Sequence, residues 1–162
     1  MKTQRKTRTR RSQAGQTLLE LGLLLPIFLL LLMGIFDIGR YMYIYILVGN
    51  AARAGAGYGA QTLGQSADTA GIQAAAQNDY QNNGGVSALT VNSSVSCGCD
   101  VAGAAPTSVA CTGGSAGTCA SGHWVVTLTV TTSGTFSALF DYPGLPATST
   151  VTRTATMRVA PI

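Results

Sequence analysis

Hydrophobic residues form one unbroken segment near the start of the chain, and farther on they alternate with polar residues. Between Gln16 and Phe36 the single charged residue is Glu20. A helix of about 21 residues, rising ~1.5 Å per residue, is about 31 Å long and matches the ~30 Å hydrocarbon core of a bilayer. This segment therefore predicts a transmembrane helix.

The same helix is expected to continue beyond the bilayer. A second apolar run extends from Tyr41 to Val48, and a stretch rich in alanine and glycine follows it up to Ala60. Small residues of this kind allow helices to pack closely. The helical segment predicted from these features covers residues 16–60.

A shorter helix is expected next. Ser66 is a good N-terminal capping residue, and the helix is predicted to run from there to about Asn82. The segment Asn82-Asn83-Gly84-Gly85 ends it. Its predicted apolar side consists of Ile72, Ala75, Ala76 and Tyr80.

Three later segments alternate apolar and polar residues, which is the pattern of half-buried strands. Arg153 falls on the apolar side of the third segment, where a charge is unexpected, and Pro143-Gly144-Leu145-Pro146 predicts the turn between the last two. The expected fold class is α+β: a long N-terminal transmembrane helix continuing outside the membrane, a short second helix and a small antiparallel β-sheet. The apolar strand positions are Leu89, Val91, Val95 and Cys97, then Val126, Leu128 and Val130, then Val151, Ala155, Met157 and Val159.

Charge is scarce and unevenly distributed. Charged residues make up 10% of the chain, against about 25% in an average soluble domain. Six of the ten basic residues precede residue 12, so the basicity belongs to a tail rather than to a face that would bind nucleic acid. One histidine, His123, and six scattered acids leave little material for a polar active site. We therefore expect no enzyme activity, catalytic residue, metal site, cofactor, nucleic-acid partner or small-molecule substrate.

The basic tail also predicts the orientation of the helix. Basic residues remain on the cytoplasmic side, so the N-terminus should be cytoplasmic and the C-terminal part extracytoplasmic. A cleavable secretory signal fits less well, because the apolar region exceeds the usual 7–15 residues. The nearest Ala-x-Ala sequence, Ala52-Arg53-Ala54, also lies far beyond that region.

The four cysteines, Cys97, Cys99, Cys111 and Cys119, all lie in the part predicted to be exported. That location favours disulfides, whereas a zinc site, the alternative, usually has paired knuckles that these spacings lack. Four cysteines allow three pairings, and the sequence does not decide among them. Nested pairing, Cys97 with Cys119 and Cys99 with Cys111, would suit a hairpin.

A motif spans the start of the apolar segment. Gly15 precedes the segment, and Glu20 follows five residues later. Together with the basic leader, these residues resemble TadE-like pseudopilins, the minor pilins of tight-adherence (Flp) type IV pilus systems. The resemblance is carried by Gly15-Gln16-Thr17-Leu18-Leu19-Glu20, Leu25-Pro26, Gly34-Ile35-Phe36-Asp37-Ile38-Gly39-Arg40 and Asn50-Ala51-Ala52-Arg53-Ala54-Gly55-Ala56.

The resemblance implies a role for each residue of the motif. A prepilin peptidase would cleave after Gly15 and expose a new amino group on Gln16. Glu20 would then pair with an N-terminal amine during subunit docking. The alternative for Glu20 is a carboxylate that reaches into the headgroups near the helix start. The implied partners are the prepilin peptidase, other pilus subunits, the assembly platform and membrane lipid.

Three regions follow: a basic cytoplasmic leader at 1–15, the transmembrane and continuing helix at 16–60, and an exported α+β domain at 61–162 with a cysteine-containing loop. The expected location is the bacterial cytoplasmic membrane, with a single span and with possible association with a pilus. The exported domain is large for a major pilin, which favours a minor subunit. The alternative is a single-pass anchored extracytoplasmic enzyme or binding module without a pilus role.

Overall fold

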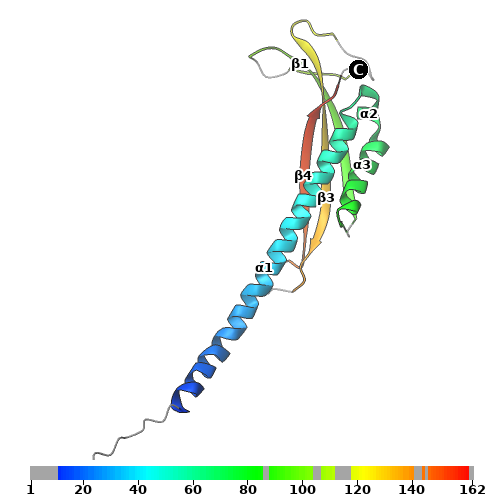
Figure 1. Ribbon diagram of the computed structural model, residues 1–162. Coiled ribbons are helices and arrows are strands. Elements are labelled where there is room, and N and C mark those ends of the chain that lie inside the picture. Colours follow the sequence, from blue (N-terminus) through cyan, green and yellow to red (C-terminus); the bar gives the residue numbers. More distant parts are fainter. Residues whose placement is uncertain are drawn as a thin grey trace, which may run out of the picture. The chain divides into compact units, whose positions relative to one another are not determined.

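The computed structural model describes residues 11–85, 88–103, 107–111, 118–140, 144 and 146–160 (Figure 1). Within them, helices precede an antiparallel sheet, which confirms the expected α+β class. The elements are α1 (Arg11–Gly59), α2 (Leu63–Ala67), α3 (Thr69–Asn82), β1 (Leu89–Asp100), β2 (Thr107–Val109), β3 (His123–Ser137) and β4 (Thr148–Arg158).

The chain divides into two compact units, and the boundary falls inside α1 between Gly39 and Arg40. In the first unit the large apolar side chains of α1 are mostly solvent-exposed; Leu19, for example, is 74% exposed. From Gly15 onward the helix is long and apolar enough to cross a membrane, and an 18-residue stretch of it has a mean hydropathy of 2.5. Pro26 lies inside this part of the helix, as the sequence indicates.

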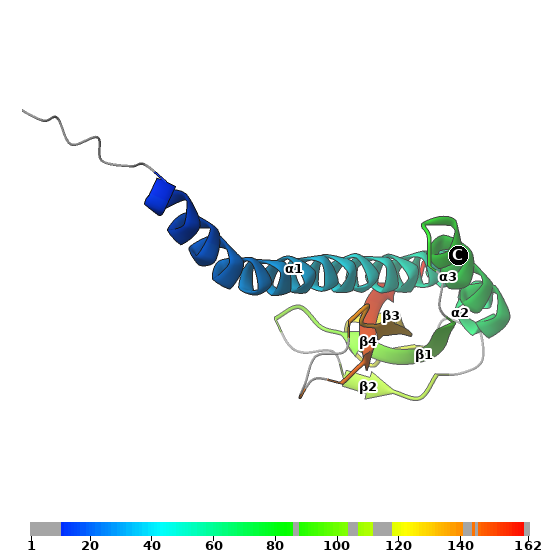
Figure 2. The same cartoon turned by 90° about the horizontal axis from the view of Figure 1, so that it is seen from below.

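The second unit is built on a four-stranded sheet in the order β2-β1-β3-β4. All pairs are antiparallel, and Figure 2 shows the part of α1 that belongs to this unit, from Arg40 onward, lying along one side of the sheet. Val126, Leu128 and Val130 of β3 point to this side and are buried. The alternation predicted for β3 is therefore confirmed. The helix residues buried against the sheet and against each other are Leu47, Val48, Ala51, Ala56, Ile72, Ala76 and Tyr80.

Close contact between α1 and its neighbours depends on small residues. A Cβ atom on Gly55 would lie 3.1 Å from the Ile72 carbonyl oxygen, and one on Gly59 would collide with Leu128. A polar contact also joins α1 to the sheet: the Thr132 hydroxyl is buried and donates to the Val48 carbonyl at 2.8 Å. The alanine- and glycine-rich stretch thus serves packing.

The predicted start of the second helix is wrong. Ser66 lies inside α2, where its hydroxyl donates to the Leu63 carbonyl at 2.7 Å. Asp68 caps α3, because its carboxylate accepts from the Gly71 N–H at 2.9 Å. Two capping residues, Thr62 and Asp68, therefore divide the segment into two helices.

The predicted end of that helix is confirmed. Gly84 has a φ of +90°, a left-handed conformation that glycine adopts without steric cost. Its N–H donates to Gln81, and the Gly85 N–H donates to the Tyr80 carbonyl at 2.8 Å. These two bonds form a Schellman motif, which satisfies the last carbonyls of α3.

The sheet contains a strand that the alternation pattern misses, and this strand changes the disulfide pairing. β2 pairs with β1 so that Val109 lies opposite Cys97. Cys111, two residues farther on, bonds to Cys97, and Cys99 bonds to Cys119. The nested pairing is therefore wrong, because the antiparallel return of β2 brings Cys111 to Cys97 instead of Cys99.

Two sequence-based expectations concern residues near β4. Of the predicted turn, Gly144 and Pro146 are described, whereas Pro143 and Leu145 lie outside the described residues. Arg153 does lie on the side of the sheet that faces α1. There its guanidinium stacks on the Tyr45 ring, 4.3 Å from the centroid, and donates to the Tyr45 hydroxyl.

Candidate functional site

The motif residues at the start of the apolar segment all belong to α1. Gly15, Gln16 and Glu20 are exposed, and a Cβ atom on Gly15 would meet no atom within 4 Å. The Gln16 side-chain amide donates to a Glu20 carboxylate oxygen at 3.5 Å. The two residues are therefore one helical turn apart on the same face of α1.

This geometry has a consequence for a chain that would begin at Gln16. Side chains on a helix lean toward its N-terminus, so the Glu20 carboxylate leans toward the backbone nitrogen of Gln16. A free amine at that nitrogen would carry a positive charge about one turn from the carboxylate. Such an amine could thus form an ion pair with Glu20 within one chain.

The surroundings of Glu20 are apolar. Leu18, Leu19 and Leu21 are each at least 60% exposed, and in a bilayer they would contact lipid. A carboxylate among lipid-facing leucines is costly unless a cation or water compensates its charge. The Gln16 amide is a neutral donor, so it offsets only part of this cost.

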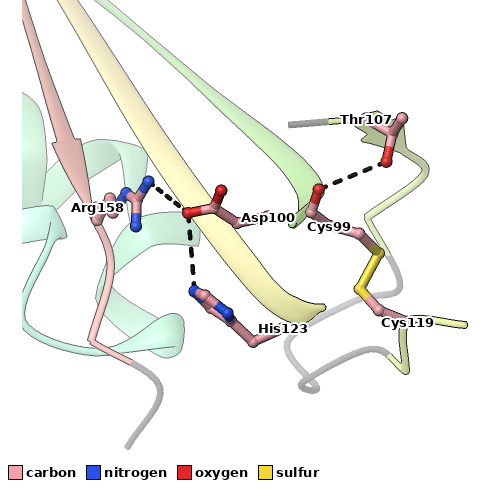
Figure 3. Close-up of polar contacts among 6 residues, drawn as sticks. All are labelled: Cys99, Asp100, Thr107, Cys119, His123 and Arg158. Carbon is pink, nitrogen blue, oxygen red and sulfur yellow. Dashed lines mark hydrogen bonds and ion pairs between the residues drawn. A yellow bond between two sulfur atoms is a disulfide. The ribbon is translucent and has the colours of Figure 1, made fainter. Parts of the chain in front are cut away.

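A second polar cluster lies at one end of the sheet, in the other compact unit. The Asp100 carboxylate on β1 lies 2.8 Å from the Arg158 guanidinium on β4 and 3.7 Å from the His123 imidazole on β3 (Figure 3). The Asp100 side chain is 21% exposed, whereas the side chains of His123 and Arg158 are more than 60% exposed. The carboxylate thus joins the ends of three strands.

The disulfides lie beside this cluster. Cys99 precedes Asp100 directly, and its carbonyl accepts from the Thr107 hydroxyl at 3.4 Å (Figure 3). All four cysteines are in disulfides, and no group of three or more potential metal ligands occurs among the described residues. The cysteine sulfurs therefore link β1 to the two segments after it instead of surrounding a metal.

A cavity of about 380 Å³ opens near the same end of the sheet. Its lining is largely apolar and includes Leu63, Trp124 and Val126, with His123 and Arg158 also contributing. Arg158 is already engaged by Asp100, so the cavity offers few convergent polar groups that would orient a small ligand.

The loop after α1 is held by a pair of polar side chains. The Tyr58 hydroxyl donates to an Asp68 carboxylate oxygen at 2.9 Å. The Gly71 N–H and this hydroxyl both stabilise the charged form, so they hold the pKa of Asp68 below its usual value. Asp68 thus acts as the cap of α3 and as the link from α3 to the end of α1.

Comparison with protein families assigns the N-terminal part of the chain. Residues 15–57 match the family described as TadE-like protein. These residues form a TadE-like domain. The match begins at Gly15 and ends two residues before the end of α1. Comparison with curated proteins and with solved structures gave no match for the chain.

The TadE-like domain contains some of the predicted site residues but not all. Gly15, Gln16 and Glu20 fall within it, and the structure places them together on α1. The cysteines and the sheet lie outside the matched residues. The resemblance inferred from the sequence is therefore confirmed for the helix that carries the motif.

Sequence reasoning missed the Asp100 cluster and the Tyr58–Asp68 pair. Asp100 and Arg158 are 58 residues apart, so no local spacing indicates their contact. Tyr58 and Asp68 are ten residues apart, but a helix that begins at Ser66 places Asp68 inside its first turn and gives it no capping role. A prediction of Asp68 as the cap of α3 would have pointed to the second contact.

Proposed function

We propose that this chain is a minor pilin, or pseudopilin, that acts in the assembly of a tight-adherence (Flp) pilus. The observation that carries the proposal is a TadE-like match that begins at Gly15 and includes Glu20. In this proposal a prepilin peptidase cleaves between Gly15 and Gln16. The partners are that peptidase, other pilus subunits, the assembly platform and the lipid of the bacterial cytoplasmic membrane.

The leader at 1–15 would stay in the cytoplasm, α1 would span the membrane, and the domain at 61–162 would lie outside. Cleavage would remove the basic residues that hold the leader at the membrane surface. The new Gln16 amine would then compensate Glu20 when the helix leaves lipid for a bundle of subunits, since an unpaired buried charge is strongly unfavourable.

Processing can be tested with a matched pair of glycine variants. A Cβ atom at Gly15 or at Gly22 would meet no atom within 4 Å, so both positions are open within the chain. Gly15→Leu should accumulate as the full-length precursor, because the side chain crowds the scissile bond, whereas Gly22→Leu should mature normally. N-terminal sequencing of the membrane protein distinguishes the two. Maturation of Gly15→Leu at Gln16 would contradict the proposed cleavage.

Docking can be tested separately at Glu20. Glu20→Gln should still be cleaved but should be depleted at least tenfold from sheared pili, because an amide cannot neutralise the amine. Glu20→Asp keeps the charge and serves as the control. Immunoblots of the membrane and sheared-pilus fractions measure how much of each protein is in the pili relative to the membrane. Normal incorporation of Glu20→Gln would remove the proposed ion pair from the mechanism.

The orientation needs its own measurement. Protease added to spheroplasts should digest the C-terminal domain and spare an N-terminal tag. Protection of that domain would reverse the proposed topology. A correctly oriented chain that is never cut at Gln16 and never found in pili would instead be an anchored binding module or enzyme.

A further inference from the structure

Strand β3 runs along α1 in the direction opposite to the helix (Figure 1). Near the end of α1, a Cβ atom on Gly59 would collide with Leu128. Farther along the strand, the Phe136 ring packs edge-on against Tyr41, with the ring centroids 5.5 Å apart. Between these two contacts the strand advances about 26 Å and the helix is about 27 Å long, so β3 follows α1 back toward the start of this unit.

The strand continues in the same direction beyond its contact with Tyr41. The Ala138 N–H donates to the Ala147 carbonyl at 2.8 Å, so the β3–β4 hairpin extends about 7 Å past that contact, and Leu139 is the next residue. On α1, about 7–8 Å of helix separate Tyr41 from Phe36, the last residue of the apolar segment. The hairpin thus advances past Tyr41 by about the length of helix that separates Tyr41 from the apolar segment.

The exposed apolar side chains of this unit gather at the same end. Among the described residues of the second unit, four large apolar side chains are more than half exposed: Met42, Tyr43, Ile46 and Leu139. The first three belong to the first turns of α1 in this unit, and Leu139, the most exposed at 63%, follows β3. Val95 on β1 and Val109 on β2 are less exposed.

The side chains around the hairpin are of the kinds found at membrane–water interfaces. The Arg40 guanidinium lies over the Phe136 ring, 5.7 Å from its centroid, and Tyr41 contacts the same ring. Tyrosine and arginine are common at headgroup depth, because each combines an apolar body with a polar end. The turn after α3 lies at this end too, since the Tyr43 hydroxyl donates to the Asn83 carbonyl at 2.6 Å, but its residues 82–85 include no large apolar side chain.

We propose that the tip of the β3–β4 hairpin inserts Leu139 into the headgroup layer of the bilayer that α1 spans. The contact gives the exported unit a second attachment to the membrane and limits its rotation about α1. Lipid is the occupant because the hairpin extends toward the apolar segment, and because any apolar side chain gains from leaving water, whereas leucine is rare among the residues that dominate protein interfaces. The inference rests on the proposed function only in requiring that α1 span the membrane.

Tryptophan fluorescence in vesicles measures the depth of the hairpin tip. Trp124 is the only tryptophan in the chain, and its indole N–H has no hydrogen-bond partner in the part of the chain that the structure describes. We therefore expect Trp124→Phe to fold. In this background, Leu139→Trp is placed in vesicles of phosphatidylcholine that carries bromine near the headgroup end of its acyl chains. Its emission should be about twofold lower than in unbrominated vesicles.

Two further single-tryptophan proteins provide the controls. Ile27→Trp reports on the middle of the apolar segment, and its emission should fall when the bromine lies near the bilayer centre. Val109→Trp places the probe at the opposite end of the sheet, where Val109 and Val126 both pair with Cys97, and its emission should not change in any vesicle. Thermal unfolding of all three proteins establishes that they are folded.

The native leucine needs its own measurement, because tryptophan itself favours the headgroup layer. Wild-type protein is irradiated in phosphatidylcholine vesicles whose lipid carries a photoactivatable group near the headgroup end of its acyl chain. Mass spectrometry of chymotryptic peptides should find lipid adducts at Leu139 but not at Val109. Leu139→Asn should lower the adducts at this hairpin at least threefold, whereas Val109→Asn should leave them unchanged.

The outcomes distinguish failure of this inference from failure of the proposed function. Quenching of Ile27→Trp without quenching of Leu139→Trp, or undiminished adducts in Leu139→Asn, would overturn the hairpin contact and leave the membrane span intact. Absence of quenching in both would overturn the span and the contact together. Equal quenching of Val109→Trp would mean that the whole domain lies on the bilayer. A Leu139→Trp probe shielded from brominated lipid and from aqueous acrylamide would assign the hairpin to a contact between copies of the chain. Either of these last two results would also overturn the proposal.

Discussion

The Arg153 guanidinium lies over the ring of Tyr45, 4.3 Å from the ring centroid, and donates a hydrogen bond to its hydroxyl. This contact joins β4 to α1 across 108 residues of sequence. It explains how a charge occupies a strand face that is otherwise apolar. The charge is compensated by the ring face and by a hydroxyl, without a carboxylate partner in this contact.

The contact with Tyr45 should therefore contribute to stability. Tyr45→Phe keeps the ring but removes the hydrogen-bond acceptor, and we expect a loss of about 1 kcal/mol. Tyr45→Leu also removes the stacking and should cost about 1 kcal/mol more. Thermal unfolding in detergent, followed by near-UV circular dichroism, measures both. Equal stability of wild type and Tyr45→Leu would show that the contact does not contribute.

Alanine substitution at two glycines near the end of α1 should affect the stability of the protein differently. A Cβ atom on Gly59 would collide with Leu128 and approach Ile72 to 3.0 Å, so Gly59→Ala should destabilise the protein by about 1–3 kcal/mol. Gly57 has open space around it, so Gly57→Ala should be neutral or stabilising by up to about 1 kcal/mol. Denaturant unfolding of the two variants side by side compares them. A Gly59→Ala protein as stable as Gly57→Ala would contradict the close packing of α1.

The disulfide pairing predicts a difference between two double variants. The bonds span 14 and 20 residues, and each should stabilise by about 3 kcal/mol. Replacing Cys97 and Cys111 with serine leaves the Cys99–Cys119 bond intact and no free thiol. Replacing Cys97 and Cys119 removes both bonds, so this variant should unfold at a distinctly lower temperature.

Thiol titration of the denatured proteins, without reductant, provides the second readout for these variants. A thiol-free and more stable Cys97→Ser/Cys119→Ser protein would support the nested pairing. Four titratable thiols in the purified wild type would mean that neither disulfide forms.

Asp68 should make stability depend on pH in acid. Its pKa is lowered in the folded protein, mainly by the Gly71 N–H and then by the Tyr58 hydroxyl. Its contribution is therefore present above the ordinary aspartate value of 3.8 and is lost as the pH falls through the lower folded value. Asp68→Asn keeps a capping oxygen but cannot titrate, so the difference between the two proteins should shrink in this window. Unfolding midpoints of both proteins from pH 7 to pH 2.5 test this. A difference in midpoint that does not change with pH would show that Asp68 does not cause the pH dependence of stability.

Local patterns were enough to predict much of the fold. The unbroken apolar segment indicates α1, and the alternation around Leu128 gives the orientation of β3. The motif at Gly15 and Glu20 is equally local, since both residues lie within two turns of one helix. The resemblance to TadE-like proteins could therefore be stated from the sequence, and the family match agrees with it.

Features that depend on distant contacts could not be predicted in this way. β2 has only three residues, too few to show alternation, and it determines which cysteine meets Cys97. Ser66 and Asp68 are both good capping residues, and only the packing of α2 and α3 decides between them. The apolar pattern of β4 does not account for Arg153, because its partner, Tyr45, is far away in the sequence.

The hydrogen bond from Thr132 to the Val48 carbonyl also sets an order of events in time. The two residues are separated by 84 positions, so α1 is made well before the strand that covers it. At a synthesis rate of roughly 5–20 residues per second, the side of α1 that β3 later covers stays uncovered for roughly 4–17 s. Slower synthesis between Val48 and Thr132 lengthens this interval. The yield of folded protein should then fall, because the uncovered side of α1 has more time to form non-native contacts.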